Sequence, residues 1–176
     1  MASDLPREGR GLAPRSIHVI CFGNELHGDD GFGNELHGDD GFGPAVHARL
    51  AAAPLPAGVR LMRADLAGLS AIGCFEGCAE AIIVDAVAGF GPPGSLHELD
   101  ADDFADAAAR DEAPAGFHGA GVGGLLRLLP AALDHLPAIR LVGVEAGQIA
   151  AFSPGLSAPV ADAVDAAATR IRALWS

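Results

Sequence analysis

Hydrophobic and polar positions along the chain fall into two alternating patterns. Short apolar runs with turn residues at their ends predict strands, and segments whose apolar residues recur every three or four positions predict helices. The predicted strands are Ser16–Cys21, Val59–Asp65, Glu80–Val87, Ser95–Leu99 and Ala138–Glu145. The predicted helices are Pro44–Ala53, Leu69–Cys78, Ala101–Arg110, Val122–Leu133 and Pro159–Trp175, the last with Val160, Val164, Ala167, Ile171 and Leu174 on its apolar face.

This alternation predicts a single α/β domain over residues 16–176, preceded by a disordered tail at 1–15. The run Glu80–Val87 is continuously apolar up to Val84, as expected of a parallel strand buried on both faces. The link from Val87 to Ser95 is too short for a helical crossover, so the strand Ser95–Leu99 should run antiparallel at a sheet edge. We therefore expect a three-layer sandwich with a mostly parallel five-stranded sheet, flavodoxin-like or phosphorylase-like.

Composition and charge exclude several classes of function. The chain has 176 residues, a net charge of −12 and no lysine, since all its basic residues are arginine. A negative chain repels nucleic acid and anionic membranes, and the missing lysine excludes a P-loop and Schiff-base chemistry. Three cysteines are too few for a disulfide framework, and no apolar run reaches membrane-spanning length. We expect a cytoplasmic protein.

The most unusual feature is a tandem repeat at residues 22–41. Phe22–Gly31 and Phe32–Gly41 both read FGNELHGDDG, so each copy carries two adjacent aspartates and one histidine. The first copy follows a predicted strand and the second precedes a predicted helix. Carboxylates just ahead of a helix complement its dipole, whereas so acidic a loop is unsuited to phosphate.

Candidate chemistry rests on an aspartate pair from the repeat, on Asp85 and on His118. Asp85 lies in an apolar strand, where a carboxylate needs a proton, a partner or a metal. If the first and third strands are neighbours, the repeat and Asp85 flank the topological switch point. With His118 they make an oxygen–nitrogen ligand set for a divalent ion such as Zn²⁺ or Ni²⁺. The alternatives are a hydrogen-bonded Asp85 at a strand end and a solvated loop histidine.

The remaining histidines and the cysteines show no spacing typical of a metal site. We interpret His27 and His37 as surface residues of the repeat and the other histidines (His18, His47, His97 and His135) as structural. Cys74 and Cys78 have no histidine nearby and are interpreted as small buried residues. No Ser, Cys or Thr lies in a recognisable nucleophile turn, so hydrolysis would depend on a metal-polarised carbonyl or water.

Several blocks together resemble the [NiFe]-hydrogenase maturation endopeptidases. The chain carries the glycine–asparagine–acidic signature of that family in the repeat, running into Phe42–Val46. The resemblance extends from about Ile17 to the end of the chain, with the blocks in the same order. Its further blocks are Ala81–Ala86, Gly116–Gly119, Leu141–Glu145 and Gly155–Val160.

The resemblance implies a monomeric endopeptidase that removes a C-terminal extension from the [NiFe]-hydrogenase large-subunit precursor after nickel insertion. The nickel arrives with the substrate, although ions such as Zn²⁺ or Cd²⁺ can also occupy such a site. By motif the nickel-recognising residues are Asp40, Asp85 and His118, with no further catalytic or cofactor-binding residue identified. The family has one copy of the loop, so Asp30 is the alternative to Asp40; adjacency to the helix favours Asp40.

Two other functions fit parts of the pattern. The duplicated loop leaves open a non-catalytic metal-binding or chaperone module that binds the precursor without cutting it. A receiver-like signalling domain shares the acidic pair and the strand-end aspartate, but it needs a lysine near its last strand, which this chain lacks.

Overall fold

A five-stranded sheet forms the centre of the protein. The computed structural model describes residues 15–23, 38–64, 69–104, 121–147 and 155–175. The strands are β1 (Ile17–Phe22), β2 (Val59–Ala64), β3 (Glu80–Val87), β4 (Leu96–Asp100) and β5 (Ala138–Glu145). The helices are α1 (Phe42–Ala51), α3 (Gly121–Ala132) and α4 (Ala158–Leu174), with 3-10 segments η1 (Gly38–Gly41) and η2 (Leu69–Phe75).

The strand order is β2-β1-β3-β5-β4, which confirms the predicted fold class. Strand β1 pairs in parallel with both β2 and β3, and β3 pairs in parallel with β5. Strand β4 is antiparallel to β5 and lies at the edge, as its short connection predicted. Because β1 and β3 are neighbours, the topological switch point of the sheet lies at their carboxyl ends, where doubly wound folds bind their ligands.

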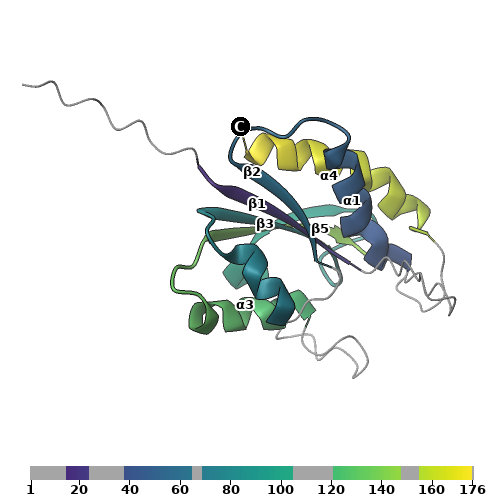
Figure 1. Ribbon diagram of the computed structural model, residues 1–176. Coiled ribbons are helices and arrows are strands. Elements are labelled where there is room, and N and C mark those ends of the chain that lie inside the picture. The colour runs from purple at the N-terminus through teal and green to yellow at the C-terminus, as the bar shows by residue number, and fades with distance from the viewer. Residues whose placement is uncertain (1–14, 24–37, 65–68, 105–120, 148–154, 176) are drawn as a thin grey trace, which may run out of the picture.

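Helices cover both faces of the sheet and create two apolar cores (Figure 1). Helices α1 and α4 pack on one face, where Val19, Val84 and Ile171 are buried together. Segments η2 and α3 pack on the other face, around Ile83 and Leu129. Alternate residues of β3 therefore point into different cores, as expected for a strand buried on both sides.

The observed elements differ from the predicted ones in two informative places. The predicted helix Leu69–Cys78 is a 3-10 segment that ends at Phe75, and it contains Gly73. Glycine is a poor helix former, and Gly77 takes a positive φ of 74°. Helix α1 begins two residues earlier than expected and ends at Ala51, since the residue before Pro54 is disfavoured in helical geometry. Where the structure describes them, the first and last residues of the other helices and strands lie within one residue of the predicted positions.

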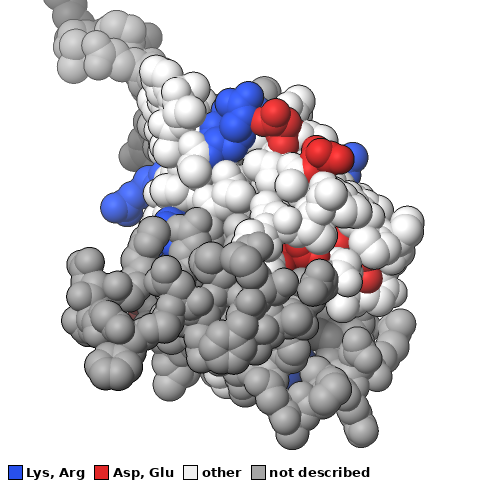
Figure 2. Space-filling view, turned by 90° about the vertical axis from the view of Figure 1, so that its right-hand side faces the viewer, with Lys and Arg blue, Asp and Glu red and all other residues white. Residues whose placement is uncertain are grey.

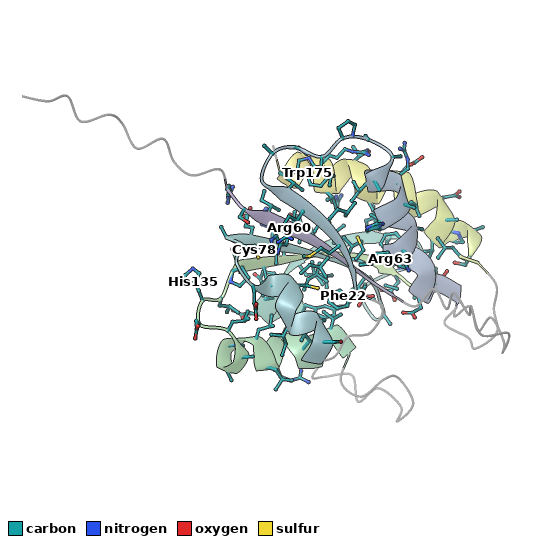
Figure 3. The ribbon with its side chains drawn as sticks, viewed as in Figure 1. Phe22, Arg60, Arg63, Cys78, His135 and Trp175 are labelled. Atoms are coloured by element: carbon teal, nitrogen blue, oxygen red, sulfur yellow. The ribbon has the colours of Figure 1, made fainter. Side chains whose placement is uncertain are left out.

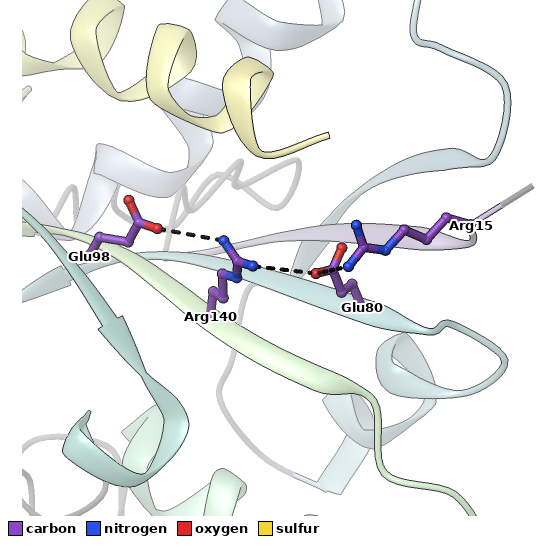
Figure 4. A network of polar contacts seen from close by, with 4 residues as sticks. All are labelled: Arg15, Glu80, Glu98 and Arg140. Atoms are coloured by element: carbon purple, nitrogen blue, oxygen red, sulfur yellow. Dashed lines mark hydrogen bonds and ion pairs between the residues drawn. The ribbon is translucent and has the colours of Figure 1, made fainter. Parts of the chain in front are cut away.

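A chain of ion pairs lies at the amino-terminal end of β3 (Figure 4). The buried Glu80 carboxylate accepts a hydrogen bond from Arg15 at 2.8 Å, and Arg140 lies 3.7 Å from the same oxygen. Arg140 also lies 3.8 Å from Glu98 on β4. Arg15, the last residue of the expected tail, is thus bonded to the sheet, whereas residues 1–14 lie outside the described part.

The described surface carries charges of both signs. On the face shown in Figure 2, basic and acidic side chains lie beside one another instead of forming one continuous patch of a single sign. Arg49 of α1 pairs with Asp165 of α4 across the outer helices. Within the described ranges, no helix combines the length and the apolar character needed to cross a membrane.

Candidate functional site

The chain leaves β1 and returns to α1 at almost the same point. Gly23 has a φ of 138°, and a Cβ atom there would lie 2.1 Å from the backbone oxygen of Asp40. A Cβ atom on Gly43 would lie 1.8 Å from the backbone oxygen of Phe22. Glycine is therefore required on both sides of this close backbone contact. The first copy of the repeat supplies Phe22 and Gly23 at the contact, and the second copy supplies the turn η1.

This junction predicts that one repeat unit is dispensable. Deleting either copy gives the same sequence and shortens the link between Gly23 and Gly38 from about 14 residues to about four. Loop-closure entropy should then raise the free energy of unfolding by about 1 kcal/mol, which corresponds to about 2–4 °C in melting temperature. Thermal unfolding of both forms measures this change. A deletion variant that fails to fold would show that the junction is misplaced.

The two aspartates of η1 occupy different surroundings. Asp39 is fully buried, and its carboxylate accepts hydrogen bonds from the Gly147 N–H at 2.8 Å and the Ser157 N–H at 2.7 Å. The Ser157 hydroxyl donates a third bond at 3.0 Å. Asp39 therefore links η1 to the segments after β5 and before α4. Asp40, the next residue, keeps partial exposure.

Asp40 lies close enough to Asp85 for their charges to interact. Burial is the largest cause that raises the pKa of Asp85 from its ordinary value of 3.8 to about 8, and the Asp40 carboxylate is the second. The Ala86 N–H donates to Asp85 Oδ1 at 2.9 Å, which partly opposes the rise in pKa. Two carboxylates held together in this way lower their energy by binding a proton or a cation.

The structure thus brings together two of the residues named from the sequence, Asp40 and Asp85. His118, Asp30 and the repeat histidines His27 and His37 lie outside the described residues. In the described ranges alone, no group of three His, Cys, Asp or Glu residues is arranged to hold a metal ion. A metal site with His118 as the third ligand therefore stays a prediction.

Sequence reasoning gave no role to Glu145, which ends β5 and is buried. Its carboxylate accepts hydrogen bonds from three consecutive backbone N–H groups, those of Gly89, Phe90 and Gly91, at 2.8, 2.9 and 3.2 Å. These bonds shape the turn that follows β3. The signal in the sequence was an acidic residue at the end of an apolar strand, the same signal that identified Asp85.

His18, His97 and Cys21 lie outside this pair, and their surroundings are those of structural groups. His18 is buried with Nδ1 2.8 Å from the Cys74 carbonyl oxygen, and His97 Nε2 lies 2.9 Å from the Ser95 hydroxyl. Burial raises the pKa of Cys21 to about 12, despite the opposing charge of Arg63, so the thiolate is suppressed.

His135 is also remote from the candidate site. In Figure 3 it projects from the side of the molecule away from Phe22, which marks the carboxyl end of β1. His135 is exposed and does not contribute to the carboxylate pair at the end of the sheet.

Fold and site together define a doubly wound α/β domain with a carboxylate pair at the carboxyl ends of β1 and β3. The hydrogenase maturation protease family model (HycI) matches residues 44–173, about three quarters of the chain. The chain therefore belongs to the hydrogenase maturation protease family. The match includes Asp85 and begins just after the repeat.

Solved structures agree with this assignment of the fold. The hydrogenase maturating endopeptidase HybD from E. coli is 22% identical, with a TM-score of 0.73 over 90% of this chain and 91% of that chain. The hydrogenase 2 maturation peptidase from a Thaumarchaeota archaeon is 29% identical, with a TM-score of 0.60 over 91% and 98%. The [NiFe] hydrogenase maturation protease HycI from Thermococcus kodakarensis is 18% identical, with a TM-score of 0.66 over 92% of both chains. Comparison with curated proteins gives no match.

Proposed function

We propose that this protein is an endopeptidase that removes the C-terminal extension of a [NiFe]-hydrogenase large-subunit precursor after nickel has been inserted. In this proposal the nickel is part of the substrate, and Asp40, Asp85 and His118 recognise it. The protein would act in the cytoplasm as a monomer. Membership of the maturation protease family supports the reaction class.

The observation that carries the proposal is the Asp40–Asp85 pair at the end of the sheet. Burial and the charge of Asp40 both raise the pKa of Asp85, so repulsion by the Asp40 carboxylate disfavours the ionised form of Asp85. A divalent ion brought in by the precursor would remove that repulsion. Carboxylate oxygens with one imidazole nitrogen form a suitable partial ligand set for nickel.

The protein's own groups would bind and orient the precursor. Asp85 must release its proton when it ligates the metal, because a neutral carboxyl is a poor ligand. Nickel held by these residues would supply Lewis-acid polarisation of a nearby carbonyl or water for peptide hydrolysis. Cys21, with its raised pKa, is unsuited to act as the nucleophile.

The test is to mix the protein with a precursor prepared with and without nickel, and to read the precursor's C-terminus by mass spectrometry. We expect a single truncated product from the nickel-loaded precursor and none from the nickel-free form. Cleavage of both forms would exclude nickel recognition as the trigger.

The tandem repeat favours one second candidate, a chaperone module that binds the precursor without cutting it. Under this alternative the nickel-loaded precursor would co-elute with the protein at its full original mass. The variant that lacks one copy of the repeat separates the two cases further. If the extra copy only hinders docking of the precursor to an endopeptidase, this variant should cleave the nickel-loaded precursor.

A further inference from the structure

We infer that Asp39 is a positioning residue, which holds η1 so that the Asp40 carboxylate stays beside Asp85. The inference deepens the proposed function and rests on it. Asp39 is fully buried and has hydrogen bonds to Gly147, just after β5, and to Ser157, just before α4. It therefore connects the turn carrying Asp40 to two segments more than a hundred residues away.

The turn is also fixed from its other side. Gly23 packs against the backbone of Asp40 so closely that a Cβ atom would lie 2.1 Å from the Asp40 oxygen and 2.8 Å from Pro44 Cδ. Gly38 begins η1 with a φ of 61°. A four-residue turn held by β1 on one side and by Asp39 on the other leaves Asp40 little freedom to move away from Asp85.

Ser157 provides an independent indication that this connection has a function. It is the N-cap residue of α4, yet its side chain makes no capping hydrogen bond to that helix. Its hydroxyl instead donates to Asp39. A serine cap usually contributes about 1 kcal/mol to a helix, so this serine stabilises η1 in place of the helix end that it precedes.

A purely structural role for Asp39 would lower stability without changing the affinity for nickel. We therefore compare Asp39→Asn and Ser157→Ala, because the second variant removes one hydrogen bond without changing any charge. The control is Glu80→Gln, which alters a buried carboxylate at the opposite end of β3, five residues from Asp85 along the strand. All variants are studied well below their melting temperatures.

The measurements are the dissociation constant for free Ni²⁺ by calorimetry and kcat and KM for the nickel-loaded precursor. We expect Asp39→Asn to weaken Ni²⁺ binding and to lower kcat at least about tenfold, with KM nearly unchanged, because docking of the large precursor depends on other surfaces. Ser157→Ala should weaken Ni²⁺ binding about threefold and lower kcat about threefold. Glu80→Gln should lower the melting temperature and leave both values unchanged.

Folded Asp39→Asn and Ser157→Ala proteins with wild-type Ni²⁺ affinity and kcat would overturn the inference. If Asp39→Asn fails to fold, Ser157→Ala decides alone. A failure of the proposed function looks different, because the wild-type protein would then neither bind Ni²⁺ nor cleave the loaded precursor.

Discussion

Replacing Asp85 by asparagine is expected to abolish cleavage and, at the same time, to make the protein more stable at pH 8. The amide keeps the shape of the side chain but loses the anionic oxygen that would ligate nickel. We expect kcat/KM for the loaded precursor to fall at least about a thousandfold. Asp134→Asn, at an exposed position remote from the pair, is the matched control and should cleave normally.

The stability change follows from the raised pKa of Asp85. The unfolded chain releases this proton near pH 4, whereas the folded protein keeps it until about pH 8. Between these values the folded state binds more protons, so the free energy of unfolding falls as pH rises, and the full cost of the carboxylate is present above pH 8. Asparagine removes that cost, which is about 2–6 kcal/mol; the upper figure corresponds to the whole pKa shift.

Thermal unfolding at pH 4 and pH 8.5 measures this effect. We expect wild-type protein and Asp85→Asn to melt together at pH 4 and to differ by at least about 4 °C at pH 8.5, with the variant higher. Full cleavage activity in the variant would contradict the proposed role of Asp85. Equal melting temperatures at pH 8.5 would instead contradict the raised pKa of the Asp85 carboxylate.

Gly43→Ala is expected to destabilise the fold strongly. The new Cβ atom would lie 1.8 Å from the Phe22 oxygen and 2.8 Å from its carbonyl carbon, so β1 and α1 would have to separate. The contacts are to backbone, which cannot rotate away as a flexible side chain can. We expect a loss of at least about 4 kcal/mol, and hence little folded protein.

Gly41→Ala provides the control for this prediction, two residues earlier in the same segment. Its Cβ atom would meet only Leu156 Cδ2, at an ordinary 3.5 Å. We expect a change within about 1 kcal/mol, measured by urea unfolding. A soluble Gly43→Ala protein with wild-type stability would show that the close backbone contact between the end of β1 and the start of α1 is wrong.

The fold was largely predictable because its strongest signals are local. The apolar runs at β3 and β5 gave the bounds of both strands without error, and the short link after Val87 gave the antiparallel edge strand. Helical spacing alone misread Leu69–Cys78, because two glycines weaken a helix that the apolar pattern would permit.

The site was predictable only in part. Asp85 was identifiable because a carboxylate interrupts an apolar strand, and parallel topology placed it near the repeat. The different roles of Asp39 and Asp40 could not be predicted from the sequence, because Asp39 forms its hydrogen bonds with Gly147 and Ser157, far along the chain. The preference for Asp40 over Asp30 and the role of His118 both stay predictions.

The close packing of Gly23 against the backbone of Asp40 has a practical consequence. Because the polypeptide departs from the sheet and rejoins it at one place, additional length between those residues adds little strain to either apolar core. A fluorescent or affinity peptide could be substituted for the surplus unit there. Under the proposed function, such a peptide would report binding of the precursor from a position close in sequence to Asp40.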